Sequence, residues 1–569
     1  MSNEEKQLLE YLIKLREKEE QENADAASIV KGVFDGENVV EAEAKFSETE
    51  NGALAYKTSG KVFVDFIFNL SSFRKAQGLD LADLTDRFLK CYKENAELAW
   101  KMLFFVGDIR GGAGERKAFF ECFYTLIRKA QQEQTREMSN EIACMLQFIP
   151  EYSRWDILIK LFDAVETTGN NFVIYDRAVK MLRKQNQLDM QNMIAGRPIS
   201  LMAKWMPSIN ATSYATKMLA RRVMTEICQY PNNPSGEKCY RKMLSALRSN
   251  LKVVEKSMTA NEWSEIDYSA VPSKAAMNLR NAFRTHDSKR YDEYIYNVSI
   301  GRDKINATVT EPHEVISKIV VYDDYKTVKA ARIKDPTLIQ IWDNLGSIAD
   351  TSNTIVVADT SGSMTDTCSG KTTCLDVSLA LAIFTAERLT GPFHNKFITF
   401  SSEPKFITIP EGDIYDKIDG IPCDMRNTNI EAVFHLLARA YATGNVRNAE
   451  MPKNVLILSD MQFDAARDVD ETREVLFDTI KRNWKIVTGN RVQMPKLIFW
   501  NLDSRVHNTI PLTEDENGLI LMSGFSKNLL SMALSGQFDP FQALIEILNS
   551  KRYEKIGYEY TCSGYDNVI

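Results

Sequence analysis

The stretch Ile355-Val-Val-Ala-Asp359-Thr-Ser361-Gly-Ser363-Met364 decides the fold that we predict for this chain. Its apolar half is typical of a buried strand, which runs directly into a carboxylate and two hydroxyls at alternate positions. An apolar helical run from Leu375 to Arg388 follows. A strand, a polar turn and a helix in this order predict the first unit of a doubly wound α/β domain, whose ligands bind at the carboxyl ends of the strands.

The D-x-S-x-S spacing places the side-chain oxygens of Asp359, Ser361 and Ser363 on one tight turn. Hard oxygen ligands of this kind suit Mg²⁺, which binds few carboxylates and keeps several waters. The turn resembles the metal-ion-dependent adhesion site of von Willebrand factor A domains, which implies bound Mg²⁺ or another divalent cation. Such a site also needs a Thr from a second loop and an Asp after the central strand, for which Thr428 and Asp460 are the candidates. The alternative is a Rossmann-like turn with a hydrogen-bonded Asp359 and no metal.

Length and composition indicate a multidomain globular protein. The chain has 569 residues, of which 44% are hydrophobic and 26% charged, and this length suits two or three domains. No apolar run approaches the roughly 18 residues of a membrane span, and the first residues lack the pattern of a signal peptide. Nine cysteines without a C-x-x-C pair indicate free thiols. We therefore expect a cytoplasmic protein with no membrane partner.

Charge is spread unevenly along the chain. The net charge is −7, yet residues 171–310 hold 22 Lys and Arg against 12 Asp and Glu, a balance of +10. Residues 1–50 hold 6 basic and 14 acidic side chains, a balance of −8. A basic segment inside an acidic protein indicates a localised anionic partner, or an intramolecular one.

The pattern of charged and apolar residues along the chain predicts three segments. Residues 1–50 form an acidic, partly disordered arm with a charged helical stretch from Glu4 to Glu22, residues 51–345 a helical module, and residues 350–569 the α/β domain. The apolar run Lys61–Phe68 fits a strand or a buried helix equally well. The helical module contains nine expected helices, at Leu79–Cys91, Glu94–Phe105, Glu115–Gln131, Glu141–Phe148, Ser153–Val165, Phe172–Leu188, Tyr214–Tyr230, Cys239–Ser249 and Lys274–Arg284. Such a row predicts an irregular α-solenoid, with a plain helix bundle as the alternative.

Two features of the helical module could bind RNA. Three glycines between Asp108 and Arg116 precede a helix and could hold a phosphate, although a tight interhelical turn is the commoner explanation. Between residues 200 and 302, basic side chains alternate with aromatic ones, as on surfaces that bind single-stranded RNA; solvated helix faces with buried rings are the alternative. The candidate RNA-binding residues are Arg110, Arg116, Lys204, Trp205, Lys217, Arg221, Arg222, Tyr240, Arg241, Lys242 and Arg284.

Several blocks of the helical module resemble a poorly characterised family of plant, fungal, bacterial and viral proteins. The blocks are Asp108–Arg116, Lys204–Asn210, Tyr240–Ser245, Trp263–Ser273 and Phe283–Tyr291. This family is similar to the TROVE-domain Ro autoantigens, ribonucleoproteins that join a HEAT-like helical ring to a C-terminal von Willebrand factor A domain. The resemblance implies an all-α HEAT-like module followed by that Rossmann-like domain, and binding of small structured RNAs or of single-stranded RNA ends.

The rest of the chain continues the α/β pattern after a mixed helical connector from Glu311 to Ile348. We expect a strand pair at Lys396–Ser401 and Pro404–Ile409, a helix at Glu471–Trp484 and a strand at Lys496–Asn501. A last strand and helix are expected at Leu519–Met522 and Ser526–Leu534. Strands that alternate with helices favour a parallel, doubly wound sheet.

The sequence offers no catalytic set. Ser369-Gly370-Lys371-Thr372 imitates the end of a P-loop, but the required first glycine is Thr365, so we expect no bound nucleotide. Five scattered histidines argue against zinc hydrolysis. We therefore expect a non-catalytic RNA-binding protein whose α/β domain binds Mg²⁺ and a protein partner. The alternatives are a protein-binding scaffold or virion component without RNA, and a metal-dependent phosphohydrolase that uses Asp359 and Asp460.

Overall fold

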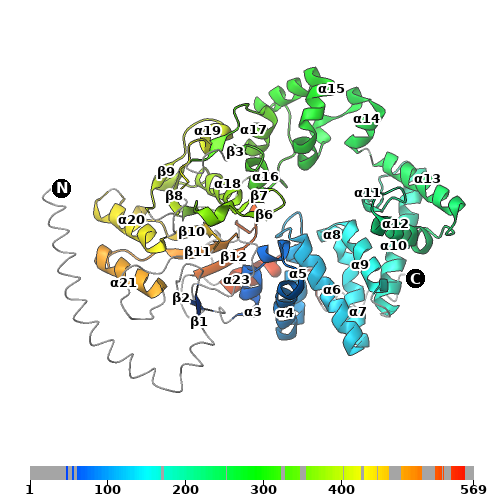
Figure 1. The fold of residues 1–569 in the computed structure, drawn as a ribbon, viewed down its shortest axis with the longest axis horizontal. Coiled ribbons are helices and arrows are strands. Elements are labelled where there is room, and N and C mark those ends of the chain that lie inside the picture. The colour runs from blue at the N-terminus through cyan, green and yellow to red at the C-terminus, as the bar shows by residue number, and fades with distance from the viewer. Residues whose placement is uncertain are drawn as a thin grey trace.

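A helical region precedes a domain built on a six-stranded sheet (Figure 1). The computed structural model describes residues 61–167, 172–251, 253–321, 327–346, 354–400, 403–423, 429–444, 446–460, 476–502, 519–527, 529–530 and 540–557, with two short strands, β1 (Phe46–Glu48) and β2 (Leu54–Tyr56). The predicted order, a helical region followed by a domain that contains a β-sheet, is confirmed. The helix expected at Glu4–Glu22 lies outside the described residues.

The C-terminal domain is organised around a mixed sheet in the order β12-β11-β10-β5-β8-β9. Its strands are β5 (Thr354–Asp359), β8 (Lys396–Phe400), β9 (Phe406–Thr408), β10 (Asn454–Ser459), β11 (Lys496–Asn501) and β12 (Leu519–Ser523). Five strands are parallel, and β9 pairs antiparallel with β8 at one edge. The strand order reverses between β5 and β10, and open α/β sheets bind ligands beyond the carboxyl ends of the strands at such a point.

Helices cover both faces of this sheet. Val356 and Ala358 of β5 pack into the core that includes α18 (Cys374–Ala386), whereas Ile355 and Val357 pack into the core that includes α20 (Ile430–Ala442). Strands that are buried on both sides read as continuous apolar runs in the sequence, which is why these strands could be predicted. The sheet domain also contains the helices α19 (Ile414–Ile418), α21 (Leu476–Thr488) and α23 (Pro540–Leu548).

The helical region contains a helix at each of the nine predicted places. Its helices are α3 (Val62–Phe68), α4 (Gly78–Glu94), α5 (Ala96–Gly107), α6 (Arg116–Glu133), α7 (Arg136–Met145), α8 (Ile149–Tyr152), α9 (Trp155–Thr167), α10 (Phe172–Ile194), α11 (Met202–Trp205), α12 (Tyr214–Arg222), α13 (Pro234–Asn250), α14 (Val254–Ala260), α15 (Ser273–Ser299), α16 (Pro312–Ile316) and α17 (Pro336–Asp343). The ambiguous run at Lys61–Phe68 is helix α3. Its Phe63 and Phe66 join the helical core and its Val64 and Phe68 join a core of the sheet, which explains why it is apolar all round.

Both ends of the helical region pack on the sheet domain. At the first end, Asn501 Nδ2 of β11 donates to the Phe68 carbonyl at 3.3 Å, and Ser71 N donates to Ser523 Oγ of β12 at 2.9 Å. At the other end, α16 packs on α18. Figure 1 shows the helices between them as an arc that leaves the sheet at α4–α6, turns through α10–α13 and returns at α15–α17.

The loop after β12 joins the two ends of this arc. Ser526 Oγ donates to the Gly112 carbonyl at 3.2 Å, while Lys527 Nζ donates to the Thr310 and Leu345 carbonyls at 3.1 and 2.6 Å. The helix predicted at Ser526–Leu534 falls largely outside the described residues.

An unexpected hairpin of β6 (Thr367–Ser369) and β7 (Thr372–Thr373) lies between the polar turn and α18. The segment that imitates the end of a P-loop forms the tip of this hairpin, where Gly370 adopts a φ of 61°. The eight cysteines in the described part of the chain are free thiols. None of the described helices is long and apolar enough to cross a bilayer.

Candidate metal centre and basic helical face

The polar turn lies at the carboxyl end of β5, at the reversal point of the sheet. Asp359 is fully buried; its Oδ1 accepts a hydrogen bond from Ser361 N at 2.9 Å, and its Oδ2 accepts one from Ser459 Oγ, the last residue of β10, at 2.6 Å. The hydroxyl oxygens of Ser361 and Ser363 are 3.2 Å apart. The two serine hydroxyls thus lie together on the turn that holds Asp359, and Ser459 is a contact that the spacing of the motif did not predict.

A second carboxylate lies beside Asp359. Asp460 follows Ser459 at the end of β10 and is only 1% exposed. Burial, and after it the charge of Asp460, raise the pKa of Asp359 well above its usual value. Two buried carboxylates that repel each other in this way favour either a proton or a bound cation. The parallel pairing of β5 with β10 therefore brings together Asp359 and Asp460, two residues of the predicted site that are more than 100 residues apart in the chain.

The donor set fits a hard divalent cation. The turn supplies one carboxylate and two hydroxyls, with Asp460 as a neighbouring carboxylate, and Mg²⁺ prefers such oxygens while it retains water. Among the described residues no group of three or more His, Cys, Asp and Glu could hold a metal, so a cation here would depend on the serine hydroxyls. Thr428, the expected ligand from the second loop, lies outside the described residues, directly before Asn429, which caps α20.

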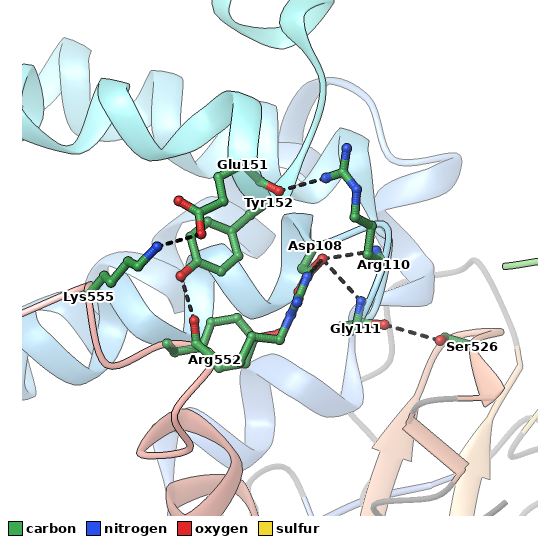
Figure 2. A network of polar contacts seen from close by, with 10 residues as sticks. Asp108, Arg110, Gly111, Glu151, Tyr152, Ser526, Arg552 and Lys555 are labelled. Atoms are coloured by element: carbon green, nitrogen blue, oxygen red, sulfur yellow. Dashed lines mark hydrogen bonds and ion pairs between the residues drawn. The ribbon is translucent and has the colours of Figure 1, made fainter. Parts of the chain in front are cut away.

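The glycine loop between Asp108 and Arg116 is a tight turn between α5 and α6, the explanation that the sequence analysis gave as the commoner one. Asp108 is fully buried and accepts hydrogen bonds from the amides of Arg110 and Gly111, at 2.9 and 3.1 Å. The same carboxylate binds Arg552 (Figure 2), whose Nη2 lies 2.7 Å from Oδ1. It also accepts a hydrogen bond from the hydroxyl of Tyr553 at 2.9 Å. The loop therefore holds the chain's own C-terminal segment.

Close packing explains the glycines of this loop. A Cβ on Gly112 would lie 2.1 Å from the Phe105 carbonyl oxygen, and one on Gly111 would lie 2.6 Å from Arg552 Nε. Arg110 is exposed and donates to the Glu151 carbonyl at 2.6 Å (Figure 2), and its role as a phosphate ligand stays a prediction. Arg116 remains exposed at the start of α6.

Several predicted RNA-binding arginines already hold acidic partners. Arg221 pairs with Glu237 at 3.1 Å, Arg222 pairs with Asp163, and Arg284 Nη1 pairs with Asp335 at 2.8 Å. These contacts connect neighbouring helices. An arginine held in this way has lost much of its attraction for a phosphate, because its charge is already compensated.

The two predicted stacking rings are not freely available. Tyr240 is fully buried and its hydroxyl donates to the Pro207 carbonyl at 2.7 Å, so its prediction as a base-stacking residue is wrong. The α13 periodicity that buries Met243, Leu244 and Leu247 buries this ring as well. Trp205 is half-buried, and the guanidinium of Arg154 covers its ring at 3.8 Å from the centroid.

A different set of side chains makes α10–α13 basic. Residues 172–250 hold 13 Lys and Arg against four Asp and Glu, a net charge of +9. All four acidic side chains have partners: Asp176 with Lys180, Glu226 with Arg183, Glu237 with Arg221, and buried Asp189 with Ser200. Seven cations form no ion pair within the described residues, namely Lys184, Arg197, Lys204, Lys217, Lys238, Arg241 and Lys242. The term basic face is used below for these seven exposed or half-exposed cations of α10–α13 and their connecting loops.

An exposed ring that was not among the predicted RNA-binding residues accompanies the basic face. Tyr214 is the first residue of α12 and is 75% exposed, and Met218 one turn later is 39% exposed. The buried stripe of this helix and its extension runs through Ala220, Val223 and Ile227. Counting back from that stripe at helical spacing places Tyr214 on the outer side, so the signal was present in the sequence.

Two family models match the chain. Residues 159–345 match one described as Domain of unknown function (DUF2828), and residues 353–565 match one described as Domain of unknown function (DUF7788). The chain is also similar to "Uncharacterized protein L728" of Acanthamoeba polyphaga mimivirus, with 28% identity over 542 residues that cover 89% of this chain and 87% of the relative. These descriptions name no ligand and no activity. Together, the matches to the two family models and to the viral protein cover most of this chain.

Proposed function

We propose that this chain is a non-catalytic RNA-binding protein whose basic face holds single-stranded RNA. The observation that carries the proposal is the set of seven exposed or half-exposed cations that no described acidic side chain neutralises. Cations in such numbers attract a polyanion, and the exposed ring of Tyr214 offers a surface on which an unpaired base can stack. The arc of helices that begins and ends on the sheet domain is compatible with the HEAT-like arrangement of the Ro proteins, which this chain resembles.

The second part of the proposal concerns the α/β domain, which we compare with von Willebrand factor A domains. Its strand order, its switch point and the turn at Asp359 support this comparison. Asp359, Ser361 and Ser363 would hold Mg²⁺, with Asp460 beside them and Thr428 as the further candidate. The bound cation would supply a positive centre that attracts an acidic group of a protein partner. The proposal includes no hydrolysis, because the part of the chain that the structure describes offers no paired nucleophile and base and no phosphate cradle beside this turn.

The alternative function is a protein-binding scaffold that uses the metal centre without RNA. The geometry of the Asp359 turn supports adhesion whether or not the basic face holds RNA. In this case the seven cations would bind an acidic protein surface.

The experiment that separates these functions is a nucleic-acid analysis of the purified protein. RNA that co-purifies, raises the ratio of absorbance at the nucleic-acid and protein maxima, and disappears on ribonuclease treatment supports RNA binding. A competition assay with blunt duplex RNA adds specificity, since duplex bases are not free to stack and should compete poorly. Protein that is free of nucleic acid and binds no single-stranded RNA at low salt would favour the scaffold.

A further inference from the structure

The basic face and the first fifty residues carry complementary charge. The face lies within a segment of net charge +9, whereas residues 1–50 hold 14 acidic and 6 basic side chains, a net charge of −8. The rest of the chain has the same excess of acid spread over more than eight times as many residues. The net charges of these two segments are therefore opposite in sign and nearly equal in magnitude.

Apolar groups accompany the charges on both segments. On α12, exposed Tyr214 and Met218 lie one turn apart, with Lys217 between them in the sequence. In the acidic segment, Leu8, Leu12 and Leu15 are spaced by four and three residues, in front of the acid-rich stretch Glu17–Glu22. Apolar contacts flanked by opposite charges give a docking surface both affinity and register.

Covalent geometry permits the two segments to meet. The strand β1 begins at Phe46, so more than forty residues precede it. A chain of forty-five residues spans up to about 150 Å when extended, and tethering raises the effective concentration of an attached segment to about the millimolar range. Even contacts that are weak between separate molecules become significant within one chain.

We propose that the acidic segment before β1 docks on the basic face of the same molecule and competes with RNA for it. The acidic side chains of the segment neutralise the seven cations, and its leucines cover Tyr214 and Met218. The docking does not depend on RNA binding, whereas the competition rests on the function proposed above. The segment thus acts as an internal substitute for the polyanion, and RNA must displace it.

Cys239 offers a direct test of docking. It is the one exposed cysteine among the cysteines of the described residues, and it lies on α13 between Lys238 and Arg241. A photoreactive cross-linker attached to Cys239 in the full chain should capture peptides from residues 1–50, and Cys239→Ser is the control for attachment elsewhere. The cross-links should disappear at about 1 M salt, where the Debye length is only about 3 Å.

Mixing labelled and unlabelled copies identifies whose segment is captured. Cross-links within one chain support the proposal. Cross-links only between copies, or none to residues 1–50, would overturn it.

Charge neutralisation in the full chain tests the competition. The variant Glu17→Gln, Glu19→Gln, Glu20→Gln and Glu22→Gln should bind single-stranded RNA about tenfold more tightly, as expected for the loss of four exposed ion pairs that RNA must break. The control neutralises four exposed acidic residues elsewhere, Asp80, Asp86, Glu403 and Glu411, and should leave the affinity within about twofold.

The outcomes of the two tests are distinguishable. Cross-links with an unchanged RNA affinity would refute the competition and keep the docking. Cross-links in a protein that binds no RNA would refute the proposed function alone.

Discussion

The carboxylate of Asp108 and the guanidinium of Arg552, 444 residues apart in the chain, form a two-point ion pair where the C-terminal segment meets the helical region. The Asp108 side chain is fully buried, and its oxygens also accept bonds from two amides and from Tyr553. Tyr553 stacks on Tyr152, with ring centroids 5.6 Å apart. This network ties the last described turn of the chain to α5 and α8.

Asp108→Asn should detach the C-terminal segment. The amide cannot accept both arms of Arg552, and hydrogen bonds to charged groups contribute about 1.5–3 kcal/mol each, so we expect a loss of at least about 2 kcal/mol in the free energy of unfolding. Urea unfolding combined with limited proteolysis near Arg552 measures both effects. Lys555→Ala, which breaks an exposed pair with Glu151, is the control and should cost less than about 1 kcal/mol. Equal effects of the two variants would contradict the role of Asp108.

Gly112→Ala should be far more harmful than Gly114→Ala. The new Cβ at residue 112 would overlap the Phe105 carbonyl, which is held in place because Ala113 N donates to it at 3.0 Å. Gly114 has a φ of 71° and open space around it, so alanine there costs only backbone strain of about 1–2 kcal/mol. Thermal unfolding of both variants checks this order. A milder effect of Gly112→Ala would mean that the loop can move away from α5.

Acid should weaken the contact between α16 and the loop after β12. His313 is buried against Phe525, and burial, followed by the charges of Arg74 and Lys274, lowers its pKa to about 3. The unfolded chain takes up a proton below the usual pKa of about 6.5 and the folded chain does not, so this residue contributes stability that is lost as the pH falls below about 6.5.

The measurement compares wild type with His313→Gln at two pH values, which removes the effects of other groups. Glu311 acts in the opposite direction, because burial raises its pKa to about 7 and its contribution is lost as the pH rises toward that value. The difference in melting temperature between wild type and His313→Gln should therefore shift against wild type between pH 7.5 and pH 5. A difference that is the same at both pH values would refute this role of His313.

Magnesium should raise the melting temperature of the wild type. A ligand at one hundred times its dissociation constant stabilises the folded state by about 2.7 kcal/mol. Asp359→Asn removes one of two buried carboxylates, so the variant should fold, keep its stability without Mg²⁺ and lose the response to Mg²⁺. Glu411→Gln, an exposed acidic residue of the same domain, should respond like wild type. An unchanged Mg²⁺ response in Asp359→Asn would show that the cation binds elsewhere.

The sheet domain was predictable because its signals are local. Buried parallel strands are continuous apolar runs, and the metal turn is one short segment at the end of the first of them. Only the register of β5 with β10 brings Ser459 to Asp359, and no local pattern contains that contact. The strand or helix ambiguity at Lys61–Phe68 is resolved by tertiary packing, because α3 is enclosed by two cores.

The RNA-binding candidates were less predictable because composition does not reveal partners. Tyr240 and Arg222 belong to the same basic and aromatic pattern as Lys204, yet one is buried and the other is paired with Asp163. The glycine loop was a candidate phosphate site because it combines glycines with arginines. In the fold it binds Arg552 of the same chain, more than 400 residues away. Such long-range contacts follow from the fold and are absent from any local pattern.

RNA affinity of a charge-reversed basic face tests the central claim most directly. The variant Lys204→Glu, Arg241→Glu and Lys242→Glu reverses three cations of the face and changes the net charge from −7 to −13. The control Lys75→Glu, Lys90→Glu and Lys93→Glu makes the same change in net charge at three exposed lysines of the first helices. Both are titrated with an RNA that carries a single-stranded 3′ tail.

We expect the affinity of the wild type to fall with salt at a log–log slope of about −0.7 per phosphate contact. At 0.1 M salt each contact is then worth about fivefold, so the variant of the basic face should bind about a hundredfold more weakly and with a shallower slope. The control should stay within a few-fold of wild type. Equal losses in both variants, or no RNA binding by the wild type at low salt, would contradict RNA binding by the basic face.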